Sequence, residues 1–168
     1  MLETDTSLTA EQKLKLLIAH RPWESEPDNA EWEDKPTGYR CRIQRHGELG
    51  HLCGYVGIPK NHPLYGKHYS DDEVADIQVH GGLTHSDSAN SDGDWGGGLW
   101  WFGFDCSHGG DLSPKMLVHL VDRNILGLDR NETYRTWDYV ENEVRELVRQ
   151  LRDEDALANQ IPNLPTER

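Results

Sequence analysis

The sequence predicts a small α+β domain in which an antiparallel sheet is flanked by an N-terminal helix and a long C-terminal helix. Alternating apolar and polar residues, typical of half-buried strands, occupy the middle of the chain. Apolar residues at helical spacing lie near both ends. The length of 168 residues fits a single domain over 1–168, with a core of about residues 8–155 and a tail at 156–168.

The first predicted helix begins after Thr9. Thr9 and Gln12 have the spacing of a capping box, in which each side chain bonds the other residue's backbone N–H. Three apolar residues then form one stripe: Leu14, Leu17 and Ile18. Pro22 ends this helix because the residue before a proline avoids helical geometry. Residues 23–37 are acidic and contain Pro27 and Pro36, so we predict a loop there.

The middle of the chain predicts a hairpin followed by two shorter strands. Residues 39–45 alternate apolar and polar side chains, and residues 51–58 predict the second strand of the hairpin. Short strands are predicted at 77–80 and 99–104. Between these strands, residues 84–98 are rich in Ser, Asp, Asn and Gly, which indicates a surface loop.

Two helices are predicted in the last third of the chain. Ser113 and Pro114 have the residue types preferred at the N-cap and the first position of a helix. The clearest helical pattern runs from Thr136 to about Leu157, with Asp138 in its first turn. Its apolar residues fall on one face: Val140, Val144, Leu147, Val148 and Leu151.

The chain is strongly acidic, with a formal net charge of −13 and a pI of about 5.0. This argues against direct nucleic-acid binding, which needs Lys and Arg to replace the counterions of the phosphates. The acidic blocks either form a solvated surface or mimic the charge of DNA toward a basic partner.

Composition also bears on the compartment. No apolar run approaches the roughly 18–20 residues of a transmembrane helix, and the first residues lack the pattern of a signal peptide. Three cysteines, Cys41, Cys53 and Cys106, leave one thiol over in any internal pairing. We therefore expect a cytoplasmic protein with no membrane association.

A first group of candidate site residues follows the last predicted strand. Asp105, His108 and Asp111 come directly after an aromatic run and turn through two glycines. Carboxylates and imidazoles at this spacing suit Zn, Mn or Mg, and they equally suit a general base with an orienting acid. Asp111 alternatively caps the helix that begins near Ser113.

A second group precedes and follows the glycine pair at 81–82. His80, Gly81, Gly82 and Thr84 follow the short strand at 77–80, and glycines let backbone N–H groups approach an anion. We predict that both groups meet at one site. Its catalytic residues are predicted to be His80, Asp105, His108 and Asp111. Its metal ligands are predicted to be His80, Asp105 and His108, and its ligand-binding residues include Gly81, Gly82 and Thr84. Alternatively, these residues only fix turns.

Three further residues are candidates for ligand binding. Trp100 either packs in the core or stacks on a flat ligand such as a base. Arg42 belongs to a set of basic residues on the first hairpin that suits a phosphate-bearing ligand. Tyr65 lies in the turn-rich loop at 59–69 and is a candidate to join the same pocket.

Four motifs together resemble a family of small hypothetical proteins encoded by bacteriophages and prophages. The motifs are Cys53–Pro59, His62–Gly66, Val79–Thr84 and the run Trp100–Asp111, and the resemblance covers roughly residues 38–148. It implies a cytoplasmic protein made during infection, which acts on a host pathway or on a nucleotide signal. It implies no particular mechanism.

These observations support more than one function. The first hypothesis is a metal-assisted hydrolase of a phosphorylated or nucleotide-like small molecule, with a divalent metal as its cofactor. The alternative is a non-catalytic counter-defence protein that sequesters a nucleotide signal or blocks a host defence protein. A third hypothesis is an acidic mimic that occupies a nucleic-acid enzyme. The sequence leaves a homo-oligomer open.

Overall fold

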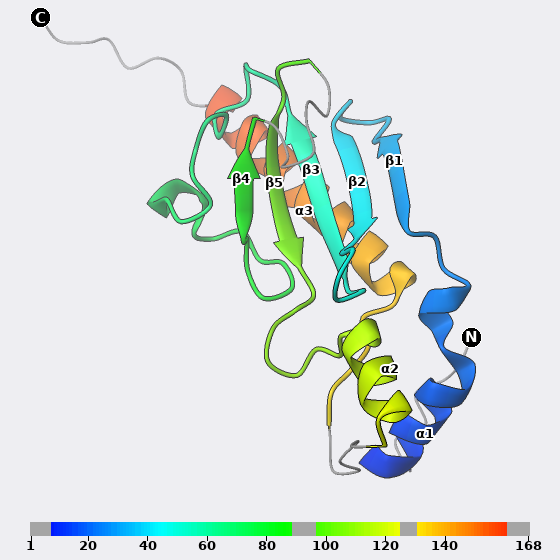
Figure 1. Ribbon diagram of the computed structural model, residues 1–168. Helices are drawn as coiled ribbons and strands as arrows, with labels where there is room; N and C mark the ends of the chain where they lie inside the picture. Colours follow the sequence, from blue (N-terminus) through cyan, green and yellow to red (C-terminus); the bar gives the residue numbers. More distant parts are fainter. Residues whose placement is uncertain (1–7, 89–96, 125–130, 161–168) are drawn as a thin grey trace, which may run out of the picture.

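The computed structural model describes residues 8–88, 97–124 and 131–160, and its fold is the predicted α+β type. Five strands form one antiparallel sheet in the order β1-β2-β3-β5-β4 (Figure 1). The strands are β1 (Asn29–Glu33), β2 (Arg40–Arg45), β3 (Leu52–Ile58), β4 (His85–Asp87) and β5 (Trp100–Asp105). The helices are α1 (Ala10–His20), α2 (Pro114–Asp122) and α3 (Trp137–Gln160), with 3-10 helices at Pro22–Glu24 and Asp72–Val74.

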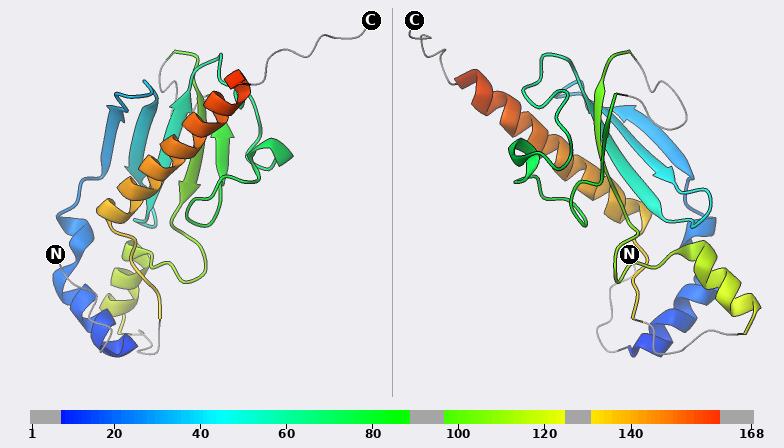
Figure 2. Two further views of the ribbon diagram at one scale, coloured as in Figure 1. Left: turned by 180° about the vertical axis from the view of Figure 1, so that it is seen from behind. Right: turned by 60° about the vertical axis from the view of Figure 1, so that its left-hand side comes forward.

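The helices occupy two places around the sheet. α3 covers one face of the sheet, whereas α1 and α2 pack together beyond one end of the strands (Figure 2). The capping box of α1 forms as predicted, and α2 begins at Pro114. Among the helices that the structure describes, none has both the length and the apolar character needed to cross a lipid bilayer.

The main core lies between the sheet and α3. Every second residue of the central strands faces this helix, and the predicted apolar stripe of α3 is buried against them. Burying one such side chain contributes about 1.5–3 kcal/mol to stability. Gly54 lets the two layers approach closely, because a Cβ there would lie 2.5 Å from the Phe104 ring and 2.7 Å from Val144.

The predicted loop at residues 23–37 is wrong, because it contains the edge strand β1. Ala30 and Trp32 alternate with acidic and polar residues, as in a half-buried strand. The acidic side chains face the basic strand β2, and Glu31 forms an ion pair with Arg40. The prolines that suggested a loop, Pro27 and Pro36, lie outside the strand.

The predicted strand at 77–80 is also wrong. Side chains of α3 hold this segment instead of a neighbouring strand: the Gln78 N–H donates to Gln150 (2.7 Å) and the His80 N–H donates to Glu143 (2.7 Å). The strand is β4, which falls inside the predicted loop at 84–98 and pairs with β5. Residues 89–96 of that predicted loop lie outside the described residues.

A buried polar network joins the helical end to the sheet. The Arg45 side chain at the end of β2 donates to Glu26 (3.1 Å), Asp28 (2.9 Å) and the Tyr134 hydroxyl (3.0 Å). The second oxygen of Glu26 accepts the N–H of Trp137 at 3.0 Å, which caps the start of α3. This network therefore fixes the first turn of α3, which borders the candidate site.

Candidate functional site

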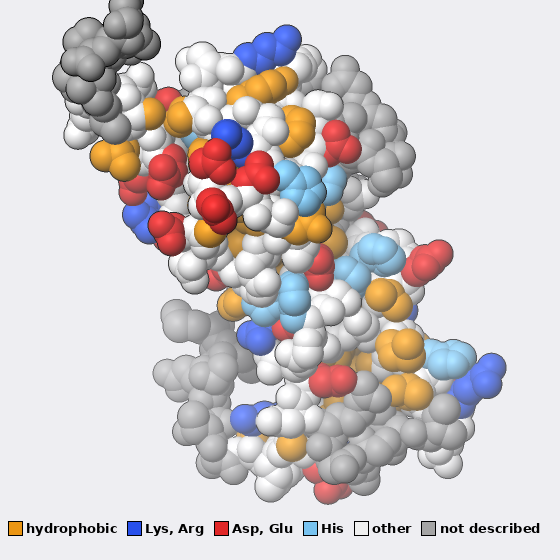
Figure 3. All heavy atoms as spheres, turned by 90° about the vertical axis from the view of Figure 1, so that its left-hand side faces the viewer, with side chains coloured by type: hydrophobic (Ala, Val, Ile, Leu, Met, Phe, Trp, Pro, Cys, Tyr) orange, Lys and Arg blue, Asp and Glu red, His pale blue; other side chains and the backbone are white. Residues whose placement is uncertain are grey.

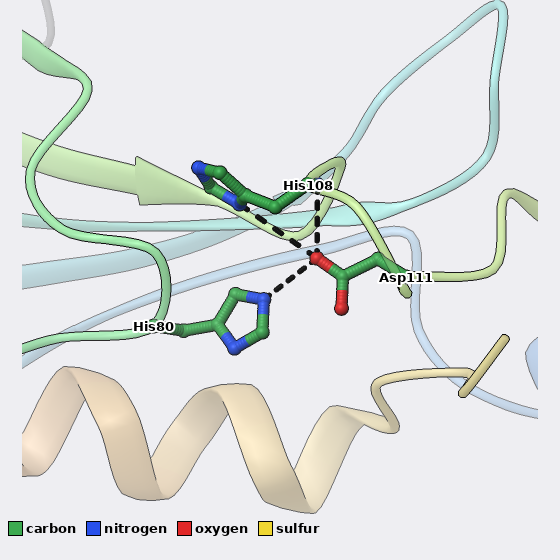
Figure 4. Close-up of side chains that lie close together, drawn as sticks. All are labelled: His80, His108 and Asp111. Carbon is green, nitrogen blue, oxygen red and sulfur yellow. Dashed lines mark hydrogen bonds and ion pairs between the residues drawn. The ribbon is translucent and has the colours of Figure 1, made fainter.

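The candidate site lies where the chain leaves β5. The turn after Asp105 is held by three hydrogen bonds: Ser107 N–H to Asp105 (3.0 Å), His108 N–H to Asp111 Oδ2 (3.0 Å) and Asp111 N–H to the His108 carbonyl (2.9 Å). The segment carrying His80 runs beside this turn, and the first turn of α3 lies below it (Figure 4). Three elements that are distant in sequence therefore meet here.

Two imidazoles and one carboxylate converge at this site (Figure 4). The Nε2 atom of His80 lies 2.7 Å from Asp111 Oδ2, and the Nδ1 atom of His108 lies 3.7 Å from the same oxygen. One ligand atom from each residue lies within 4.8 Å of the others. The Asp111 side chain is 1% exposed, so this carboxylate forms the buried floor of the cluster.

Neighbouring side chains orient the cluster. The Tyr139 hydroxyl lies 2.9 Å from Nδ1 of His80, and Arg135 donates to Asp111 Oδ1 at 2.8 Å. Burial alone would raise the pKa of Asp111, but hydrogen bonds from Arg135, His80 and the His108 backbone outweigh it and hold this pKa below its usual range. Asp111 is therefore an anion at neutral pH.

Gly81 allows the two histidine segments to approach. Its φ is +66°, and a Cβ there would lie 2.2 Å from Cε1 of the His108 ring. The predicted anion-binding role of this turn is not supported by its hydrogen bonds. The Gly82 N–H donates to the Val79 carbonyl (2.9 Å) and the His80 N–H donates to Glu143. Gly81 thus serves the packing of the His108 ring.

Asp105 occupies a different position from the one predicted for a metal ligand. It faces the side of the sheet away from α3, and its Oδ1 lies 3.9 Å from Nδ1 of His108. Its Oδ2 accepts a hydrogen bond from the Thr84 hydroxyl at 2.8 Å. The compact ligand set therefore contains Asp111 in place of Asp105.

Three predicted ligand-binding residues lie elsewhere. Trp100 begins β5, so the length of this strand, about 17 Å, separates it from Asp105. Its indole donates to the Lys67 carbonyl (2.9 Å), and its ring packs against Tyr65 at 5.9 Å. Arg42 lies in the middle of β2, opposite Glu31 of the edge strand. The structure does not bring these residues to the His80 cluster.

The basic residues of the first hairpin do not form one anion site. Arg45 is held by Glu26 and Asp28 at the helical end, and Arg40 pairs with Glu31 on the edge strand. Acidic partners thus neutralise two members of the predicted phosphate-binding set.

Three residues that border the site were not singled out in the sequence: Arg135, Tyr139 and Glu143. Tyr139 and Glu143 are four residues apart on α3, so they share a helix face. Their polar groups lie beside the buried apolar stripe of α3. This position at the border of the core is the one sequence signal that would have indicated contact with a polar neighbour.

Histidine side chains gather on the side of the molecule at the β4 edge (Figure 3). The rings of His80 and His108 contact each other edge to face, with centroids 5.5 Å apart. No protein-family model, curated protein or solved structure gives a significant match to this chain.

Proposed function

We propose that this protein is a metal-dependent hydrolase of a phosphorylated or nucleotide-like small molecule, with His80, His108 and Asp111 as ligands of one divalent cation. One observation carries the proposal: a ligand atom from each of these residues lies within 4.8 Å of the others. Two nitrogens and one carboxylate oxygen match the three-residue sets of catalytic zinc sites, which keep a further position open for water or substrate.

The distances and the surroundings of the cluster fit a cation. Ligand bonds of about 2.0–2.1 Å in a tetrahedral site put neighbouring ligand atoms about 3.4 Å apart. The observed separations from Asp111 Oδ2, 2.7 Å to His80 and 3.7 Å to His108, lie on either side of this value. Tyr139 at Nδ1 of His80 leaves its Nε2 directed at the cluster, as outer-shell partners of metal ligands do.

The His108 imidazole adds support. Its Nδ1 atom is buried and has no hydrogen-bond partner in the parts of the chain that the structure describes. Buried polar atoms without a partner are rare because they lose the hydrogen bonds that water gave them. A cation bound through this nitrogen would remove that loss.

The remaining side chains suit hydrolysis of a phosphoryl group. A divalent cation supplies polarisation of a phosphoryl oxygen and lowers the pKa of a water molecule. We assign Asp105, which lies outside the ligand set and 3.9 Å from His108, the role of general base. Arg135 stacks over Tyr139 at 5.1 Å beside Asp111, where its guanidinium can pair with an anionic oxygen of the substrate.

A second candidate function is binding without turnover, in a phage counter-defence protein of the host cytoplasm that sequesters a nucleotide signal or blocks a host defence protein. The observation that favours it is the saturation of His80: both ring nitrogens lie within hydrogen-bond distance of Tyr139 and Asp111 without a metal. His80 and Asp111 thus form a hydrogen-bonded pair that Tyr139 and Arg135 complete, as well as part of a candidate ligand set.

Metal titration followed by an activity screen tests the proposal. We expect one equivalent of Zn²⁺ or Mn²⁺ to bind, and His108→Ala to weaken this binding at least about tenfold. His119→Ala is the matched control, since His119 is exposed on α2. Metal-dependent phosphate release from nucleotides or aryl phosphates supports the hydrolase. Tight ligand binding without turnover supports the second function, and absence of metal binding overturns the first.

A further inference from the structure

A polar cavity of about 430 Å³ lies on the face of the sheet away from α3. Tyr55 of β3 and His85 of β4 face each other across Gly103, which pairs with both in the strand register. Their rings meet edge to face at 5.4 Å, and a Cβ on Gly103 would lie 2.3 Å from the Tyr55 ring. The missing side chain at position 103 therefore allows these rings to form one wall of the cavity.

The histidines that line the cavity carry unused hydrogen-bonding atoms. His51 is 5% exposed, and its Nδ1 has no hydrogen-bond partner within the described residues. The same holds for the buried Nε2 of His85. The His51 ring also stacks on His46, with centroids 4.8 Å apart and planes 12° from parallel. Buried polar atoms of this kind gain free energy when a ligand supplies the missing partner.

The cavity is lined almost entirely by neutral groups. Burial lowers the pKa of His51 and of His85, so both imidazoles are neutral at neutral pH, and it raises the pKa of the Tyr55 hydroxyl. The lining includes the Asp105 carboxylate but neither Lys nor Arg among the described residues. This chemistry favours an uncharged ligand rich in hydrogen-bond donors over a phosphate or another anion.

We propose that this cavity binds a nucleoside. Flat imidazole and phenol rings suit contact with a base, and the carboxylate of Asp105 suits the hydroxyls of a ribose or an amino group. The volume falls within the range of about 300–1,000 Å³ typical of small-molecule sites.

The cavity adjoins the His80 cluster through Asp105, which lines it and lies 3.9 Å from His108. A nucleoside seated here would direct its phosphate toward His108. The position assigned to the phosphate rests on the proposed function. The assignment of the nucleoside pocket does not depend on it. Together they assign a nucleotide as the substrate class, with the base and ribose on the open face of the sheet.

Calorimetric titration of the metal-free protein with the four common ribonucleosides tests this proposal. We expect at least one of them to bind with a Kd below about 1 mM, and ribose or inorganic phosphate to bind at least about tenfold more weakly. His85→Phe keeps a ring against Tyr55 but removes the nitrogens, and Asp105→Asn keeps the shape but removes the charge. Each is expected to weaken binding about tenfold or more.

A matched variant provides the control. His119→Phe changes an exposed histidine of α2 and is expected to leave nucleoside binding unchanged. The proposal is overturned when none of the nucleosides binds, or when His85→Phe and Asp105→Asn both bind like the unaltered chain. Nucleoside binding without metal binding overturns the proposed function and leaves the pocket, and the reverse result overturns the pocket alone.

Discussion

The His108 ring lies against the α-carbon of Gly81, in the space that a side chain at position 81 would occupy. A Cβ there would approach Cε1 to 2.2 Å and Nδ1 to 2.4 Å. Contacts this short do not occur between non-bonded atoms, so the ring or the backbone must move when any larger residue stands at this position. The meeting of the two histidines thus depends on a missing methyl group.

Gly81→Ala is expected to weaken Zn²⁺ binding about 10–100-fold, because it displaces a ligand ring. Gly82→Ala is the matched control. Its φ of +83° gives the same backbone penalty, about 1–2 kcal/mol, but no atom lies within 4 Å of the new Cβ. Metal titration and thermal unfolding of both variants check this prediction. Equal metal affinities in the two variants would contradict it.

Tyr139→Phe is expected to lower the affinity for metal about tenfold with little change in the unfolding temperature. The hydroxyl that orients Nδ1 of His80 is lost, whereas the aromatic ring remains in place. Tyr69→Phe, on an exposed tyrosine, provides the comparison. Unchanged affinity in Tyr139→Phe would show that the hydroxyl does not orient a metal ligand.

Glu26→Ala is expected to reduce the free energy of unfolding by about 1–3 kcal/mol, because it removes one carboxylate partner of the buried Arg45, which keeps Asp28 and the Tyr134 hydroxyl. The change also removes the acceptor for the Trp137 N–H. Glu24→Ala breaks the exposed pair with Arg21 and should lose at most about 1 kcal/mol. Urea unfolding measures both values. A loss of similar size in both variants would mean that the Glu26 network adds little to stability.

The free energy of unfolding is expected to fall as the pH is lowered, and His62 is one cause of this loss. The Leu64 N–H donates to Nδ1 of this buried histidine (3.0 Å), so the folded ring is neutral. Burial lowers its pKa from the ordinary 6.5, outweighing a backbone hydrogen bond to Leu151 and nearby carboxylates that raise it. Below pH 6.5 the unfolded chain binds a proton that the folded chain does not. The contribution of His62 is therefore present above pH 6.5 and is lost as the pH falls through the lowered folded value.

Urea unfolding between pH 7.5 and 5 measures this effect. His62→Gln is expected to flatten the pH dependence relative to the unaltered chain, by about 1.4 kcal/mol for each unit by which the folded pKa lies below the unfolded one. His119→Gln, on exposed α2, should leave the slope unchanged. A slope unaffected by His62→Gln would mean that this ring takes up its proton equally in both states.

The parts of the fold that follow from local pattern were predictable. The stripe from Val140 to Leu151 is buried as its spacing predicted, since helical periodicity depends on the helix alone. The edge strand β1 was missed because acidic residues are typical of loops. Their pairing with the basic strand β2 is a tertiary contact that the local pattern does not show. The segment at 77–80 resembles a strand, but contacts with Gln150 and Glu143 decide its conformation.

The candidate site was predictable only in part. His80 and His108 stood out because they adjoin glycine-rich turns at predicted strand ends. The geometric cluster contains Asp111 and not Asp105, because the last residue of β5 faces away from α3 while the following turn brings Asp111 back toward His80. Trp100 begins β5, whereas the cluster follows the last residue of this strand, so the length of β5 separates the two.

Two adjacent residues, Tyr134 and Arg135, reach in different directions. The Tyr134 hydroxyl bonds Arg45 and Glu26 at the helical end, whereas the Arg135 guanidinium bonds Asp111. The backbone of Thr133 also pairs with Asp111 and its neighbours. A tilt of the α1–α2 pair would consequently displace the Arg135 guanidinium from Asp111. A protein that binds those helices would therefore act on the proposed metal site, which lies at the same end of the sheet.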